Sequence, residues 1–174
     1  MSPFSVLGLP DSFEVDIAAL EKTHRDLSRA LHPDRYAQAP AGERRAALDR
    51  AVVANEAFRT VRDPLTRAEA LFTLRGVAVG DGKEPKPDAA FLMDVLEKRE
   101  ALSDAKESKD ATAVKKLMDE ARREMARVMD GLTAGFALPD ERLGEALGLL
   151  GELRFFRRFL EEGSSVEDEL DHAP

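Results

Sequence analysis

The sequence predicts an all-α protein. Ala, Leu, Glu and Arg dominate its 174 residues, and these residues have the highest helix propensities. No long β-branched run of the kind that a buried strand needs is present. Apolar residues instead recur at steps of three and four, the period of a helix with one buried face. A hydrophobic fraction of 43% is ordinary for a globular chain, and the length allows one compact domain or two small ones.

The chain begins with a short apolar segment over residues 4–9, which we expect to form a brief helix. A longer helix is expected over residues 16–31, with Asp16 as its N-cap. One face of this helix is apolar and the opposite face is basic. The apolar face consists of Ile17, Leu20, His24, Leu27 and Leu31, and the basic ridge consists of Lys22, Arg25 and Arg29.

A proline ends this helix. Pro33 lacks an N–H and its ring clashes with the preceding turn, and Asp34 can close a turn through its side chain. The basic ridge therefore leads to an exposed turn made of His32, Pro33 and Asp34. His24, on the apolar face, is interpreted as a histidine at the edge of the core.

A second helix is expected over residues 43–61, antiparallel to the first. The face that should pack on the first helix consists of Leu48, Ala51, Val52, Asn55 and Phe58. Asp63-Pro64 ends this helix, and a short helix over residues 66–74 follows. The first domain is thus predicted to span residues 1–75.

Residues 76–87 contain three glycines and two prolines without a helical period, which predicts a linker. The second domain is predicted over residues 88–162. Its helices are expected at 88–107, 111–132 and 140–160, and their short connections predict an antiparallel three-helix bundle. The polar, acidic residues 163–174 are expected to be disordered.

The net charge of −8 lies entirely in the second part of the chain. Residues 1–75 hold eleven basic and eleven acidic residues, whereas the remainder holds fifteen and twenty-three. An acidic bundle argues against nucleic acid as a partner and favours a basic protein surface. No stretch is long and apolar enough to span a membrane, and Met1-Ser2-Pro3 lacks the basic start of a secretory signal, so we expect a cytoplasmic protein.

The residue types also limit the chemistry. The chain has no cysteine, which excludes disulfides, thiol catalysis and thiolate-bound zinc or iron–sulfur clusters. Its three histidines show no metal-ligand spacing with carboxylates. We therefore expect neither a metal nor another cofactor.

The first bundle helix carries more apolar surface than a bundle core needs. At about 100° per residue, a core stripe consists of Phe91, Val95 and Leu102, and Leu92, Met93 and Leu96 lie off that stripe. On the last helix, Phe155 and Phe159 are expected to point away from the core face. That core face consists of Leu149, Leu153, Phe156 and Leu160.

Exposed apolar residues rimmed by carboxylates are typical of a protein-docking surface. The pattern alone leaves a second interpretation open, in which Leu92 and Leu96 pack on the first domain and Phe155 fills a bundle edge.

Several motifs together resemble known families. The His32-Pro33-Asp34-Arg35 turn after a basic helix, followed by Asn55-Glu56-Ala57-Phe58 and by residues 63–68, resembles the J-domain of DnaK-type co-chaperones. Residues 91–102 and Leu153-Arg154-Phe155 are similar to HscB, the J-protein of iron–sulfur cluster assembly. The resemblance extends to about Leu160.

This resemblance implies two partners and no enzymatic activity. The basic ridge and the His32-Pro33-Asp34 turn would bind an HscA-like ATPase of the DnaK type and stimulate it. The bundle would bind an IscU-like scaffold protein and deliver it as client. The implied scaffold-binding residues are Leu92, Met93, Leu96, Glu97, Glu100, Asp104 and Phe155. Asp104 stands where the family usually has Glu, and the role of Phe159 is open.

Two other functions are alternatives to this one. A J-protein with a different client would keep the His32-Pro33-Asp34 turn and use the bundle as a general interaction module. An enzyme using His32 and Asp34 as acid and base is disfavoured, because the chain shows no nucleophile motif, metal cluster or phosphate-binding glycine loop.

Overall fold

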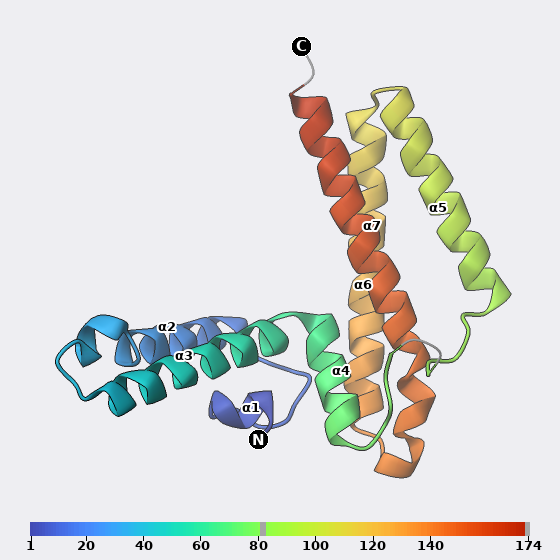
Figure 1. The fold of residues 1–174 in the computed structure, drawn as a ribbon. Coiled ribbons are helices and arrows are strands. Elements are labelled where there is room, and N and C mark those ends of the chain that lie inside the picture. Colours follow the sequence, from blue (N-terminus) through green and yellow to red (C-terminus); the bar gives the residue numbers. More distant parts are fainter. Residues whose placement is uncertain (81–82, 173–174) are drawn as a thin grey trace. The chain divides into compact units, whose positions relative to one another are not determined.

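The computed structural model describes residues 1–80 and 83–172, and every regular element in these ranges is a helix (Figure 1). The chain divides into two compact units, of which the first is Met1–Ala78 and the second begins at Val79. Residues 81–82 of the predicted linker and residues 173–174 of the predicted tail lie outside the described residues. No helix in the described ranges is long and apolar enough to cross a membrane.

The first unit is built on an antiparallel helical hairpin, as expected from the sequence. Its longest helix, α3, packs against both α1 and α2. The elements in order are α1 (Pro3–Val6), α2 (Ile17–Ala30), the 3-10 helix η1 (Pro33–Tyr36), α3 (Ala41–Arg62) and α4 (Pro64–Leu74).

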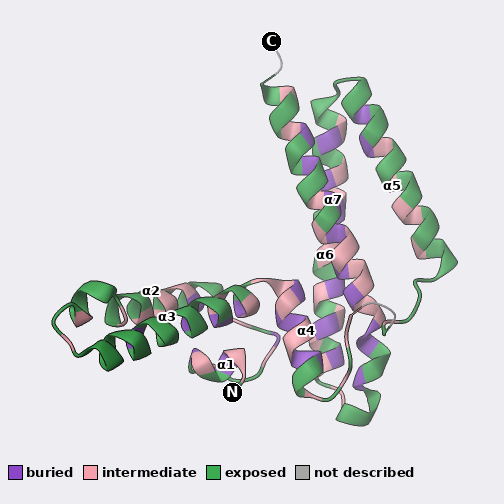
Figure 2. Cartoon of the chain, in the orientation of Figure 1, coloured by how far each residue is buried: buried purple, intermediate pink, exposed green. Residues whose placement is uncertain are grey.

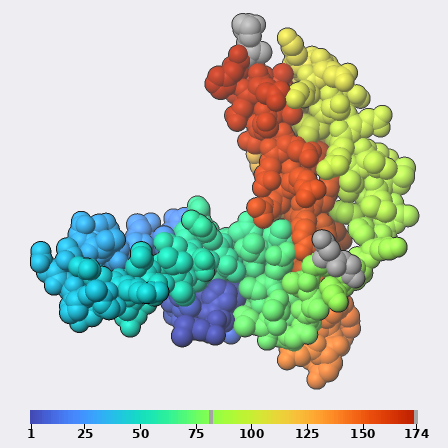
Figure 3. Space-filling model, viewed as in Figure 1, coloured from blue at the N-terminus to red at the C-terminus, as the bar shows by residue number. Residues whose placement is uncertain are grey.

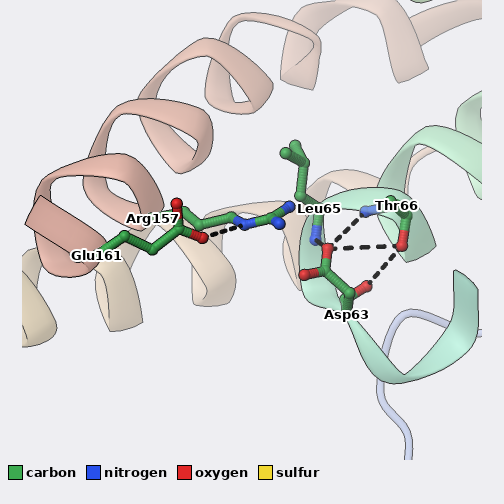
Figure 4. A network of polar contacts seen from close by, with 5 residues as sticks. All are labelled: Asp63, Leu65, Thr66, Arg157 and Glu161. Atoms are coloured by element: carbon green, nitrogen blue, oxygen red, sulfur yellow. Dashed lines mark hydrogen bonds and ion pairs between the residues drawn. The ribbon is translucent and has the colours of Figure 1, made fainter. Parts of the chain in front are cut away.

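Aspartates set two of the helix starts in this unit. The Asp16 carboxylate accepts the Ala19 N–H at 3.0 Å and caps α2. Asp63 lies between α3 and α4, and one of its carboxylate oxygens accepts the N–H groups of Leu65 and Thr66 at 3.0 Å each (Figure 4). These bonds satisfy donors that have no partner inside the helix. The start of α2 agrees with the prediction, whereas α4 begins at Pro64, before the predicted start at residue 66.

The predicted inner face of α3 is wrong in part. Leu48 is 58% exposed and Val52 is also exposed, whereas the buried side chains of α3 are Ala47, Ala54, Ala57 and Val61. Relative to the prediction, α3 is rotated about its own axis, because it packs against α1 as well as α2. Its short alanines permit close approach to both neighbours, which longer side chains would prevent.

The second unit is a three-helix bundle in which α7 packs closely on α6, and α5 lies against both. Its elements are α5 (Ala89–Glu107), α6 (Ala111–Phe136), the 3-10 helix η2 (Asp140–Ala146) and α7 (Gly148–Asp171). In the described part of the predicted linker, no helix forms between Arg75 and Asp88.

Residues 140–146 form a 3-10 helix where the sequence predicted the start of the last α-helix. Leu143 and Ala146 are buried at a spacing of three residues, which places both side chains on one side of a 3-10 helix. A Cβ at Gly135 would lie 2.4 Å from the Cβ of Ala146, so this glycine of α6 lets η2 approach closely.

The predicted disorder of the tail is also wrong, because α7 continues through Asp171. Val166 is buried, and a Cβ at Gly163 would lie 2.8 Å from Cγ of Met118 on α6. Lys106 of α5 pairs with Glu169 at 2.8 Å. The acidic composition favours a solvated tail. Gly163 and Val166 are nevertheless buried, and their spacing of three residues places both on the side of α7 that faces the bundle core.

The buried face of α7 differs from the predicted one. Its buried residues are Leu150, Leu153, Phe156, Phe159, Gly163 and Val166, and Phe159 is 1% exposed. Phe159 was expected to point away from the core. It is buried because α7 contacts both α5 and α6, so its buried surface is wider than a single stripe.

Candidate functional site

The His32-Pro33-Asp34 turn lies at the exposed end of the hairpin. Pro33 begins η1, and the backbone of His32 is extended, as expected for a residue before proline. The side chain that closes the turn is His32, whose Nδ1 accepts the Asp34 N–H at 3.3 Å. The prediction that Asp34 closes it is therefore wrong. The Asp34 side chain is 90% exposed, so its carboxylate oxygens face solvent and can accept from a partner.

The basic ridge lies on the exposed face of α2 and leads to this turn. Lys22, Arg25 and Arg29 are all exposed. Arg29 has an acidic neighbour, Asp26, at 3.9 Å, and both side chains are more than half exposed. Ion pairs of this kind contribute little to folding, so the ridge keeps its cationic character on the surface.

His24 lies at the edge of the hairpin core, where the sequence placed it. Its ring stacks on Phe58 with 3.9 Å between centroids, and Nε2 lies 2.8 Å from Oδ1 of Asn55. These contacts hold α2 against α3, and a histidine in that role is structural.

The second candidate surface is on α5. Leu92, Met93 and Leu96 are 48%, 57% and 61% exposed, and we call these three residues the α5 patch. The buried residues of α5 are Leu102 and Ala105, so the first three turns of the helix contribute no buried side chain (Figure 2). The patch is rimmed along the helix by exposed carboxylates, namely Glu97, Glu100 and Asp104.

Phe155 on α7 is half-buried and meets the start of α5 through another aromatic residue. Its ring contacts Phe91 edge to face, with 5.7 Å between centroids and an angle of 89°. Phe91 directly precedes Leu92, so the contact between Phe155 and Phe91 places Phe155 next to the start of the α5 patch. Phe155 also contacts Phe156 and Phe159. It therefore belongs partly to the bundle and partly to the surface that α5 and α7 form side by side (Figure 3).

Sequence reasoning missed a lysine in the contact between α5 and α6. Lys98 is 13% exposed and its Nζ lies 2.5 Å from Asp94 and 3.4 Å from Glu124. Burial lowers the pKa of Lys98, but its hydrogen bond to Asp94 and the charge of Glu124 outweigh this effect and raise it overall. Lys98 lies three residues after Val95 and four before Leu102. This helical spacing places it on the same face as the predicted core stripe, so its partial burial could have been predicted from the sequence.

A second missed feature is the ion pair between Arg154 of α7 and Glu84, which lies before α5. Glu84 falls in the predicted linker, where no period marks any side chain as buried. Nearby on α7, the pKa of Glu152 is raised, first by burial and then by the charge of Asp88. Carboxylates from two segments thus gather at the start of α5.

An antiparallel hairpin with an exposed His-Pro-Asp turn, followed by a separate helical bundle, defines a J-domain co-chaperone. Residues 87–163 match the family described as the HSCB C-terminal oligomerisation domain. The HscB co-chaperone homologue of Aeromonas hydrophila is 39% identical over 171 residues, which cover 98% of each chain.

Solved structures agree with this match. HscB from Vibrio cholerae superposes with a TM-score of 0.85 at 30% identity, over 98% of this chain and 99% of the other. Human HscB gives 0.84 at 25% identity, over 95% of this chain and 81% of the human one. The chain belongs to the HscB family of co-chaperones.

Proposed function

We propose that this chain stimulates ATP hydrolysis by an HscA-like chaperone of the DnaK type and delivers an IscU-like iron–sulfur scaffold protein to it, in the cytoplasm. One observation carries the proposal. The first unit exposes a His-Pro-Asp turn beside a basic ridge, and the second exposes three large apolar side chains rimmed by carboxylates. Two chemically different surfaces on separate units fit an adaptor that binds two partners.

The chaperone-binding surface acts through charge. The exposed Asp34 carboxylate is an acceptor for a cationic or N–H donor on the ATPase, and the basic ridge complements an acidic surface. The chain makes and breaks no covalent bond. It accelerates hydrolysis by binding one conformation of the ATPase more tightly than another, which shifts the population toward the hydrolysing state.

The scaffold-binding surface acts through burial. Fully burying a side chain such as Leu or Met stabilises a complex by roughly 1.5–3 kcal/mol before the entropic cost of association. Glu97, Glu100 and Asp104 around the α5 patch favour a basic scaffold surface and speed the encounter. Phe155 extends the same surface from α7.

The proposal is tested by the ATPase rate of an HscA-like chaperone with and without an IscU-like scaffold. We expect this chain to raise the rate alone, and to raise it further when the scaffold is present. Stimulation that does not change when scaffold is added would favour the alternative of a J-protein with a different client.

Reversing the charge of the ridge is expected to weaken chaperone coupling mainly by slowing association. For the Lys22→Glu, Arg25→Glu, Arg29→Glu variant we expect an association rate lower by a factor of about 10 or more, since steering fields change such rates by roughly 10–1,000-fold. Wild-type coupling should weaken as salt rises, because exposed charges are screened over about 10 Å at 0.1 M.

A variant with the same charge change elsewhere is the control for this test. Lys115→Glu, Lys116→Glu, Arg123→Glu alters three exposed cations of α6 and should leave the chaperone rate unchanged. Equal loss in both variants, or coupling that does not depend on salt, would show that the ridge has no specific role.

A further inference from the structure

An ion pair joins the segment that leads into α5 to helix α7. Nη1 of Arg154 donates to Oε2 of Glu84, and the other carboxylate oxygen accepts the Gly80 N–H at 3.3 Å. The Glu84 side chain is 13% exposed and that of Arg154 is 34% exposed. A charge-assisted hydrogen bond that is largely shielded from water is stronger than a surface ion pair.

The pair lies at the junction of the two helices that carry the proposed docking residues. Asp88 follows Glu84 by four residues and caps α5, accepting the Phe91 N–H at 2.7 Å. Arg154 directly precedes Phe155, whose ring contacts Phe91. This ion pair therefore connects the entry of α5 to the turn of α7 that holds Phe155.

Electrostatics make Arg154 important at this point. Besides Glu84, two further carboxylates lie near this junction: burial raises the pKa of Glu152, and the charge of Asp88 raises it further. Like charges of this kind push the α5 entry away from α7. The guanidinium of Arg154 supplies attraction across the same junction.

The first half of α5 is held by partly buried contacts, such as those of the Phe91 ring with Phe155 and Phe156. No residue of α5 before Leu102 is buried. In the described residues, ion pairs join the middle and the end of the helix to the bundle, namely Lys98–Glu124 at 3.4 Å, Arg99–Glu162 at 3.5 Å and Lys106–Glu169 at 2.8 Å. A helix end with few buried contacts opens locally at low free-energy cost.

We propose that Glu84 and Arg154 form a clasp that positions the α5 patch beside Phe155 for scaffold binding. Both are positioning residues, and the inference rests on the proposed function. A docking surface made from two helices binds more tightly when the helices are already ordered, because less conformational freedom is lost in the complex. Glu84 is too buried to offer much surface to a partner, so its effect is indirect.

The test is a double-mutant cycle with Glu84→Gln, Arg154→Gln and the double variant, measured as the Kd for an IscU-like scaffold. Loss of a charge-assisted hydrogen bond predicts binding about tenfold weaker for Glu84→Gln. If the residues act as one clasp, the double variant binds no more weakly than the weaker single variant. Arg154→Lys keeps the charge and should retain most of the affinity.

Hydrogen exchange on the free protein measures positioning without any partner. Glu84→Gln should speed exchange of the amides of residues 92–96 and leave those of α6 unchanged. Stimulation of the chaperone without scaffold should equal that of the wild type. Arg142→Gln is the control, because it breaks an exposed ion pair with Glu145 in η2 of the same unit.

Each outcome bears on the inference. Wild-type scaffold affinity in Glu84→Gln overturns it, with or without faster exchange, and leaves the proposed function standing. A loss in Arg154→Gln alone would mean that Arg154 contacts the scaffold directly, which also overturns the clasp. A wild-type chain that does not bind the scaffold would overturn the proposed function and the inference together.

Discussion

Replacing Asp34 by asparagine is expected to abolish stimulation of the DnaK-type ATPase while the protein remains folded. The substitution keeps the size of the side chain and removes its charge. Since Asp34 is 90% exposed, the change in unfolding free energy should stay within about 0.5 kcal/mol. The expected result is a hydrolysis rate equal to that of the chaperone alone, measured in single turnover, with an unchanged Tm.

Two further variants sharpen this test. His32→Gln should also lose stimulation, because the imidazole nitrogen that accepts the Asp34 N–H orients the turn. Asp49→Asn changes another exposed carboxylate of the first unit, on α3 and away from the ridge residues of α2, and should stimulate as the wild type does. Stimulation by Asp34→Asn at the wild-type level would refute a role for the turn in chaperone coupling.

Removing the α5 patch is expected to abolish scaffold binding with little effect on stability. In the Leu92→Ala, Met93→Ala, Leu96→Ala variant, all three truncated side chains are about half exposed or more. Residues at the centre of an interface each contribute on the order of 1 kcal/mol or more, so we expect a Kd more than about 100-fold higher. Calorimetric titration with an IscU-like scaffold measures this loss. Stimulation through the His32-Pro33-Asp34 turn should persist, and the additional stimulation by scaffold should disappear.

A buried leucine of the same helix provides the matched control. Leu102→Ala should lower the unfolding free energy by about 2–5 kcal/mol, as truncation in a core does. Phe155→Ala is kept separate from the patch variant, because its contacts with Phe91 and Phe156 make part of its effect structural. Unfolding of the triple variant, or scaffold binding at the wild-type Kd, would contradict docking through the patch.

Local signals in the sequence located most of the fold. Asp16, Pro33 and the Asp63-Pro64 pair placed helix ends correctly, because capping and proline effects act within one turn of the chain. Helical phase also separated the exposed Leu92, Met93 and Leu96 from the predicted core stripe, of which Leu102 is buried and Phe91 and Val95 are half-buried. Both inferences need only the geometry of a single helix.

The sequence by itself therefore determined an all-α chain with a His-Pro-Asp turn and apolar residues off the core face of α5. Only the tertiary structure decided how wide the buried face of each helix is. Leu48 is exposed and Phe159 buried because α3 and α7 each pack against two neighbours, and one apolar stripe cannot indicate a second partner. The same holds for Glu84 and Arg154, since 70 residues separate them and no local period links two such side chains.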